Sequence, residues 1–143
     1  MLSIQPGSDE NMSFAHDLTK LNMASYYSRH NRTWDRRIFE KSWAETDNYC
    51  LFENDILVGI LRCSHDREHF YIRAIQVIPQ AQNHGIGAFA LLYAESLCKA
   101  LFFRAIRLHV FEDSPARRLY SRMGFTELVN ENDGTLLLEK ELA

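Results

Sequence analysis

The segment from Val77 to Gly87 has the residue types and the spacing best suited to bind an anion. It predicts the end of a strand, a short loop carrying Gln82-x-x-Gly85-x-Gly87, and the start of a long apolar helix. The N–H groups at a helix N-terminus are free to donate, and they lie at the positive end of the helix dipole. Glycine lets the backbone approach a ligand closely. The segment predicts a phosphate-binding loop, although a capped helix start without a ligand also explains two glycines.

A second motif follows one helix and one strand later. It consists of Ser114-Pro115-Ala116-x-x-Leu119-Tyr120-x-x-x-Gly124-Phe125. Taken in this order with Gln82-x-x-Gly85-x-Gly87, it resembles the paired motifs of the GNAT superfamily of acyl-CoA-dependent N-acyltransferases. The motifs lie within residues 70–126, and the expected order of elements extends the resemblance over almost the whole chain.

The resemblance implies acetyl-CoA as the acyl-donor cosubstrate, with no metal. The pantetheine arm is expected beside the strand that precedes the loop, near the backbone of Ile75 and Val77. The pyrophosphate is expected on the backbone amides of Gln82, Asn83, His84, Gly85, Ile86, Gly87 and Ala88. Many relatives carry a basic residue at the position of His84. An exposed polar loop residue is the alternative, because an unperturbed histidine is mostly neutral at pH 7.

The resemblance also gives Tyr120 a role, as the donor of a proton or a hydrogen bond to the departing sulfur. A phenol stays protonated at pH 7 and is a suitable donor. The alternative is structural, because Tyr120 also falls on an apolar helical stripe. Ser114 replaces an asparagine that usually contacts the cofactor in relatives, and both a cofactor contact and a simple helix cap stay open for it.

The general base is marked less clearly than the phosphate loop. Relatives often place a glutamate on the central strand, which here is Phe70-Tyr71-Ile72-Arg73-Ala74-Ile75-Gln76-Val77. Strict alternation places four of these residues on one face, and none of the four is a carboxylate. They are Tyr71, Arg73, Ile75 and Val77. The nearest titratable candidates are Glu68, His69 and Tyr71, which would act directly or through a water chain.

The acceptor side is expected to involve one arginine and three aromatic residues. If the face of Arg73 opens into the cleft, this residue can bind a carboxylate of an amino acid or a peptide, whereas an internal ion pair is the alternative. Tyr26, Tyr27 and Trp34 lie at the junction of the first two helices, which walls the acceptor site in relatives. These rings are expected either to pack against the acceptor or to belong to the core.

The segment His65-Asp66-Arg67-Glu68-His69 matches the His-x-x-Glu-His pattern of one class of zinc proteases. That chemistry requires a helix, because only a helix brings both histidines to one metal ion. Here the segment lies between two expected strands and has no obvious third ligand. A solvated hairpin loop is therefore the preferred interpretation.

The remaining sequence supplies the elements that must position these residues. Apolar spacing and turn signals predict the order β-α-α-β-β-β-α-β-α-β-β. Strands are expected at 2–5, 48–53, 56–63, 70–78, 105–111, 125–129 and 135–141, and helices at 8–25, 34–46, 85–102 and 114–123. This order predicts an α/β (α+β) fold with a mixed, mostly antiparallel central sheet and helices on both faces, which is also the GNAT arrangement.

Length and composition limit the class of protein. A chain of 143 residues, 46% hydrophobic and 24% charged, is expected to form a single globular domain. The resemblance implies that this is one N-acetyltransferase domain over residues 1–143. A net charge of −3 disfavours nucleic acid as the main partner. Charges interrupt the most apolar segment, at 88–103, which argues against a membrane span. The 3 cysteines show neither disulfide nor metal spacing and indicate a reducing, cytoplasmic location.

We therefore expect an enzyme that transfers the acetyl group of acetyl-CoA to a primary amine of a small molecule, an amino acid or a peptide. The amine is expected to attack directly in a ternary complex. The alternative is a non-catalytic acyl-CoA-binding regulatory module, because the strand glutamate and the asparagine of relatives are missing. Dimers are common in this fold, so a homodimer is left open, and the sequence does not identify the acceptor.

Overall fold

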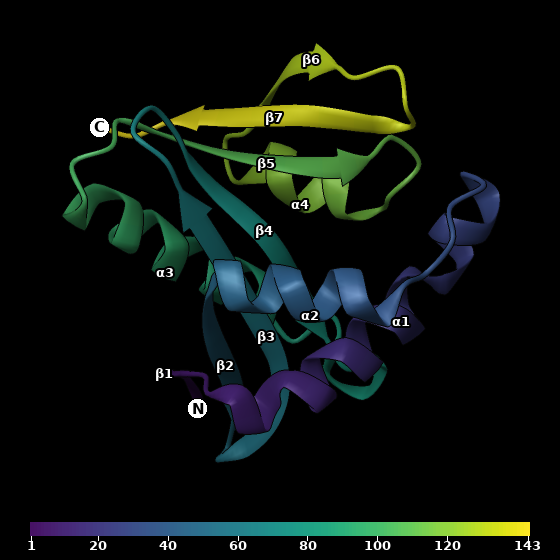
Figure 1. Ribbon diagram of the computed structural model, residues 1–143. Helices are drawn as coiled ribbons and strands as arrows, with labels where there is room; N and C mark the ends of the chain where they lie inside the picture. The colour runs from purple at the N-terminus through teal and green to yellow at the C-terminus, as the bar shows by residue number, and fades with distance from the viewer.

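The computed structural model describes residues 1–143 and contains one sheet with helices on both faces (Figure 1). The strands are β1 (Leu2–Pro6), β2 (Asp47–Glu53), β3 (Ile56–His65), β4 (Phe70–Val77), β5 (Ala105–Phe111), β6 (Thr126–Asn130) and β7 (Thr135–Glu141). The helices are α1 (Met12–Arg29), α2 (Arg36–Glu45), α3 (Ile86–Ala100) and α4 (Ala116–Arg122), with the 3₁₀ turns η1 (Asp9–Asn11) and η2 (Pro79–Ala81). The predicted order of elements is confirmed. The second helix begins at Arg36 rather than Trp34, because Asp35 caps it by accepting the N–H of Arg37.

The strands lie in the order β1-β2-β3-β4-β5-β7-β6. All neighbouring pairs are antiparallel except β4 and β5, which run parallel. A parallel pair needs a crossover connection, and α3 supplies it. The sheet is therefore mixed and mostly antiparallel, as predicted, and α3 begins close to the end of β4.

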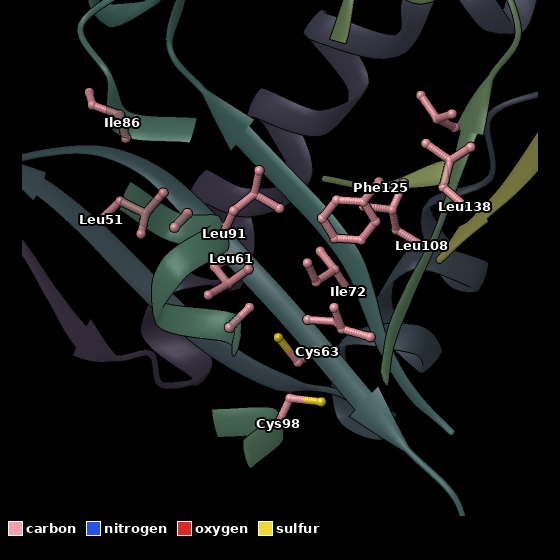
Figure 2. Close-up of a cluster of buried hydrophobic side chains, with 14 of the residues drawn as sticks. Leu51, Leu61, Cys63, Ile72, Ile86, Leu91, Cys98, Leu108, Phe125 and Leu138 are labelled. Atoms are coloured by element: carbon pink, nitrogen blue, oxygen red, sulfur yellow. The ribbon is translucent and has the colours of Figure 1, made fainter. Parts of the chain in front are cut away.

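The main core lies between the sheet and α3. Figure 2 shows Leu91 and Cys98 of α3 among side chains from the sheet, including Leu61 on β3 and Ile72 on β4. All three cysteines are buried free thiols. Burial raises the pKa of Cys63 to about 12, so this thiol stays protonated and packs as an apolar side chain. None of the helices combines the length and the apolar character that crossing a bilayer would require.

A smaller core holds α1 and α2 on the opposite face of the sheet. It contains Ala15 of α1, Phe39 and Trp43 of α2, and Ile60 of β3. Because Ile60 and Leu61 are consecutive residues of one strand, their side chains point to opposite faces. The pair α1–α2 and the helix α3 therefore cover different faces of the same sheet.

The end of α3 contains a residue in an unfavourable conformation. The N–H of Phe103 donates to Cys98 at 3.1 Å and the N–H of Phe102 to Lys99 at 2.9 Å, which is the paired bonding of a Schellman motif. Phe102 occupies the left-handed position with φ of +67°, and the residue is 93% exposed. A residue with a Cβ pays roughly 1–2 kcal/mol in this conformation, whereas glycine adopts it freely.

We predict that Phe102→Gly raises the free energy of unfolding by about 1 kcal/mol, because it relieves this strain without losing buried area. Phe102→Ala is the matched control, since it removes the same ring but keeps the Cβ, and should change stability by less than about 0.5 kcal/mol. Urea denaturation of the three proteins measures both differences. A glycine variant no more stable than the alanine variant would contradict the left-handed conformation of this residue.

Candidate active site

The chain passes from β4 through η2 into α3 by a loop with two residues in the left-handed region. Asn83 has φ of +67° and Gly85 has φ of +80°. Gly85 is the N-cap of α3, and a Cβ added there would meet no atom within 4 Å. Backbone conformation therefore favours glycine at this position, and the space in front of it is open.

The N–H groups from Asn83 to Ala88 have no backbone acceptor. The first N–H of the helix that reaches a carbonyl is that of Phe89, which donates to Gly85 at 3.1 Å. This row of consecutive free donors stands at the positive end of the α3 dipole. Such a row of donors is suited to bind an anion without a lysine side chain, and phosphate binding at this loop stays a prediction.

Gly87 has a different role from Gly85. A Cβ at position 87 would approach Cδ2 of Leu119 to 3.0 Å, so its absence lets α4 pack against the first turn of α3. The start of α4 is held by Ser114, whose Oγ accepts the N–H of Ala116 at 3.2 Å. Ser114 therefore acts as a cap, and a cofactor contact of Ser114 stays a prediction.

The parallel strands β4 and β5 pair only over their first residues. Their registered pairs end at Ile72 and Leu108, and beyond this point the strands diverge (Figure 1). After the end of β4, Ile78 donates its N–H to Val58 on β3. Because backbone groups alternate along a strand, those of Val77 point to the open side, toward the gap between β4 and β5.

The open edge of β4 is partly occupied by side chains. The carbonyl of Val77 accepts hydrogen bonds from Nδ2 of Asn22 and Nε2 of Gln82, each at 3.1 Å. These bonds tie α1 and the phosphate loop to the end of β4. The N–H groups of Val77 and, by the same alternation, Ile75 have no partner strand on this side. They are free to donate to an extended ligand.

The predicted alternation along β4 is wrong, because the strand contains a β-bulge. The register with β3 skips Arg73, which is the extra residue. Tyr71 and Arg73 stay together, with the guanidinium carbon 4.2 Å from the ring centre, on the face turned away from the main core. Ile75 and Val77 pack instead against the main core. The four residues therefore do not share one face.

Tyr120 lies partly buried on α4, where it packs against the main core. Its ring meets Phe125 edge-on, with the ring centres 5.9 Å apart. Burial raises the pKa of Tyr120 to about 12, and no hydrogen bond from the protein offsets this effect. The hydroxyl therefore stays protonated at pH 7 and is available as a donor. The structural and the functional interpretations of Tyr120 are thus compatible.

A cavity of about 970 Å³ connects the phosphate loop, the open edge of β4, α4 and the junction of α1 with α2. Its lining includes most residues predicted to bind the cofactor, namely Ile75, Val77, Gln82, Asn83, Gly85, Ile86, Gly87, Ala88, Ser114 and Tyr120. It also includes the residues predicted at the acceptor side, namely Tyr26, Tyr27, Trp34 and Arg73. His84 is not part of the lining, and its Nδ1 lies 3.0 Å from Oε1 of Glu53. The structure thus brings the two predicted sites into one space.

Two of the candidate bases do not line this cavity, although the ring centre of His69 lies 6.1 Å from that of Tyr71. Glu68 and His69 belong to the tight turn between β3 and β4, where Oδ1 of Asp66 accepts both of their N–H groups at 2.8 Å. The length of β4, roughly 20–25 Å, separates this turn from the phosphate loop. The turn confirms the predicted hairpin loop at His65–His69, and no cluster of three potential metal ligands occurs in the protein.

The third candidate base, Tyr71, lies against His109, a residue that the sequence did not mark as functional. Its ring stacks on His109 of β5, with the ring centres 6.2 Å apart and the planes 8° from parallel. His109 lines the cavity, and its Nε2 lies 3.1 Å from Oε2 of Glu131. If Nε2 donates to this carboxylate, Nδ1 is left to accept a proton. The alternation of β5, which sets His109 opposite to Leu108 and Val110, was the available signal.

Arg62 is a second residue that the sequence analysis missed. It is buried in the middle of β3 and lines the same cavity. A single charged residue within an otherwise apolar strand was the signal for it. On the other side of the cavity, Arg118 and Arg122 of α4 belong to the lining. The cavity therefore has arginines on both sides.

Comparison with known proteins supports one family. The sequence model of the acetyltransferase (GNAT) family matches residues 15–125, and no curated protein matches the chain. Similar solved structures include a GNAT family acetyltransferase from Elizabethkingia anophelis with acetyl-CoA bound, which is 20% identical, with a TM-score of 0.77 over 99% of this chain and 98% of that chain. The ribosomal-protein-S18-alanine N-acetyltransferase from Escherichia coli is 17% identical, with a TM-score of 0.77 over 100% and 95%. Arabidopsis thaliana Naa50 in complex with the bisubstrate analogue CoA-Ac-MVNAL is 19% identical, with a TM-score of 0.78 over 99% of each chain.

At these low identities, the structural similarity establishes the shared fold. The family match goes further, because it covers most of the chain and includes the phosphate loop, β4, β5 and Tyr120. The free donors at the start of α3 and the gap between β4 and β5 lie within the matched residues. The chain therefore belongs to the acetyltransferase (GNAT) family.

Proposed function

We propose that this protein is an N-acetyltransferase that moves the acetyl group of acetyl-CoA to a primary amine by direct attack in a ternary complex. The observation that carries the proposal is the row of free N–H groups from Asn83 to Ala88, which borders the same cavity as Tyr120. The phosphates and the thioester of one donor molecule can then occupy one continuous space. We assign residues 1–143 to this single catalytic domain.

The donor is held mainly by backbone groups in this proposal. The pyrophosphate binds the free N–H groups at the start of α3, and Arg118 and Arg122 add positive charge nearby. The pantetheine arm lies along the open edge of β4 and accepts hydrogen bonds from Ile75 and Val77, as an added strand would. The side chain of His84 has no direct part, because it pairs with Glu53 outside the cavity lining, whereas its backbone N–H belongs to the row of free donors.

The reaction forms a C–N bond and breaks the C–S bond of the thioester. The amine must lose a proton during its attack, and a thiolate must leave. We assign the role of proton acceptor to His109, because it is the histidine that lines the cavity. The carboxylate of Glu131, 3.1 Å from Nε2, stabilises the imidazolium that forms. Glu68 and His69 are not retained as bases, since they lie at the far end of β4.

Tyr120 assists the leaving sulfur as a hydrogen-bond donor rather than as an acid. Its pKa of about 12 lies well above the value of about 8.5 for an ordinary thiol, so full proton transfer to the thiolate is uphill by roughly 5 kcal/mol. A hydrogen bond from the neutral phenol still stabilises negative charge on sulfur beside the buried ring. His109 takes up the proton of the amine, and this proton finally reaches the thiolate through solvent.

The acceptor side has aromatic walls. The ring of Tyr26 stacks on Phe111 at 5.5 Å, and Tyr27 packs against Trp34 at 5.3 Å. Fixed rings of this kind suit an acceptor with an apolar group beside its amine. Two similar structures are named for a protein or peptide acceptor, an alanine of ribosomal protein S18 and the peptide part of CoA-Ac-MVNAL. We therefore place the acceptor among small-molecule amines, amino acids and peptides.

The proposal is tested by the release of CoA thiol from acetyl-CoA in the presence of small amines, amino acids and peptides with a free N-terminus. Release that depends on an acceptor supports the proposal. A protein that binds acetyl-CoA but releases no thiol with any acceptor would instead be a non-catalytic acyl-CoA-binding module.

We predict that Gly85→Glu weakens acetyl-CoA binding at least about 100-fold, because it places a carboxylate in the open space beside the pyrophosphate. Gly85→Ala is the matched control. It suffers similar backbone strain at φ of +80° without the charge, and should weaken binding less than about tenfold. Calorimetric titration measures both affinities, and equal losses in the two variants would argue against a phosphate at this position.

We predict that Tyr120→Phe lowers kcat by about 10- to 100-fold, with little change in the affinity for acetyl-CoA, because it removes one hydrogen bond to a charged sulfur. The loss should be constant between about pH 6 and pH 10, since a pKa of about 12 keeps the wild-type hydroxyl protonated throughout this range. Steady-state rates across this range are the measurement. An effect that disappears toward pH 10 would mean that the tyrosine titrates lower and acts as an acid.

We predict that His109→Gln lowers kcat by about 100-fold or more, because the substituted amide cannot accept the amine proton. His69→Gln is the comparison variant, since His69 lies in the β3–β4 turn outside the cavity lining, and should keep wild-type turnover. The two variants are compared by thiol release at saturating acetyl-CoA. Wild-type turnover in His109→Gln would remove this residue from the mechanism.

A further inference from the structure

Arg62 is a buried arginine without a carboxylate partner. Its side chain reaches from β3 toward the end of α2, and the residue is only 5% exposed. Nη2 donates to Oγ of Ser42 at 2.9 Å and to Oγ1 of Thr46 at 3.1 Å, and Nε donates to Oγ1 of Thr46 and Oδ1 of Asn48, each at 3.3 Å. All of these acceptors are neutral and Arg62 takes part in no ion pair, so no carboxylate of the protein compensates the charge of this guanidinium.

Aromatic rings cover part of this guanidinium. Its central carbon lies 4.7 Å from the ring centre of Phe39 and 5.6 Å from that of Trp43. Burial lowers the pKa of Arg62 to about 10, so the side chain is still charged at pH 7. A cation held in an apolar environment interacts strongly with any anion that can reach it.

One nitrogen of Arg62 is left to meet such an anion. Every fully buried polar side-chain atom of the protein has a hydrogen-bond partner. Nη1 of Arg62 has none, so it is not fully buried. Nη1 is therefore accessible, and the space beside Arg62 is the cavity that it lines. This cavity also contains the aromatic walls that we assign to the acceptor.

The other charged residues on this side of the cavity are mainly basic. Arg73 has no ion pair; its Nε donates to Oγ of Ser64 at 2.8 Å. Arg32 pairs with Asp133, 3.4 Å away, beyond the cavity lining. Asp35 is the single carboxylate of the lining, and it is engaged in capping α2. The acceptor side therefore has an excess of positive charge, although the protein has a net charge of −3.

We propose that the acceptor amine carries a carboxylate, and that this carboxylate binds Nη1 of Arg62. The proposal rests on the acetyltransferase function proposed above and adds the chemical class of the acceptor. A guanidinium paired with a carboxylate in a water-poor pocket gives both affinity and orientation, because the bond is charge-assisted and directional. The carboxylate belongs either to a free amino acid or to an acidic side chain near the N-terminus of a peptide.

The alternative is a purely structural arginine that ties the end of α2 to β2 and β3. This alternative predicts that Arg62 affects stability and not the choice of acceptor. The two explanations therefore differ in the ratio of kcat/KM for an acceptor with a carboxylate to kcat/KM for the matched neutral acceptor. A general loss of activity lowers both values equally and leaves this ratio unchanged.

The experiment compares kcat/KM for matched acceptors in the thiol-release assay. One set contains L-alanine, L-methionine and L-phenylalanine, each against its α-amide. The other set contains C-terminally amidated tripeptides with Glu or Gln at the first or second position, which separates a side-chain carboxylate from an α-carboxylate. We expect wild-type protein to prefer the carboxylate member of one set by at least about tenfold.

Variants of Arg62 identify the group that recognises the carboxylate. Arg62→Gln should reduce the preference to about one, and Arg62→Lys should retain part of it. Thr46→Val is the matched control, because it removes two hydrogen bonds of Arg62 but keeps its charge, and should preserve the preference even if it lowers stability. If Arg62→Gln does not fold, the wild-type ratio and the Arg62→Lys ratio still decide the question.

The proposal is overturned if thiol release is measurable and neither set shows a preference in the wild-type protein. It is also overturned if the preference persists in Arg62→Gln. Failure of the underlying function has a different signature, namely acetyl-CoA binding without thiol release for every acceptor, and that result would reject both proposals together.

Discussion

The active site depends on the point at which β4 and β5 stop pairing. Two parallel strands normally satisfy each other's backbone groups, but here the pairing ends at Ile72 and Leu108 and leaves an edge inside the protein. The bulge at Arg73 lies just beyond this point and shifts the alternation of β4 by one residue, so that later side chains point to the opposite face from the one that strict alternation predicts. As a result, the residues after it keep their apolar side chains in the core while their backbone groups face the cavity. An edge strand that would be a liability on the surface becomes a binding edge within the fold.

The site is electrostatically positive without relying on lysine. Free N–H groups at the start of α3 and the arginines of α4 lie on the donor side of the cavity, and Arg62 and Arg73 lie on the acceptor side. The net charge of −3 gives no indication of this local excess, because all acidic residues except Asp35 lie outside the cavity lining. Such an arrangement suits a donor with several phosphates and, in our proposal, an acceptor with a carboxylate. In this account backbone hydrogen bonds hold the phosphates of the donor, and an arginine holds the carboxylate of the acceptor. The aromatic rings line the part of the cavity that the acceptor occupies.

The order of elements and the loop with free donors before α3 could be predicted from the sequence, because both depend on residues close together in the chain. The role of Tyr120 follows from the family resemblance and stays part of the proposal. The bulge could not be predicted, since one extra residue leaves the apolar pattern of β4 almost unchanged. The choice of Glu68 and His69 as bases followed from proximity in sequence, whereas an extended strand separates them from the loop at the start of α3 and leaves them outside the cavity lining. His109 and Arg62, to which we assign roles in our proposals, were missed because the strands and helices around them are distant in sequence and meet only in the folded protein.

The central claim is that the free N–H groups at the start of α3 bind the pyrophosphate of the donor. Amide NMR spectra of the protein titrated with CoA and, separately, with pantetheine test it residue by residue. We expect CoA to shift the amide signals of Asn83 through Ala88, because hydrogen bonds to phosphate form there. Pantetheine, which lacks the pyrophosphate, should shift the signals of Ile75 and Val77 and leave the loop unchanged. CoA shifts confined to other parts of the protein, or loop shifts of equal size with pantetheine, would contradict the account.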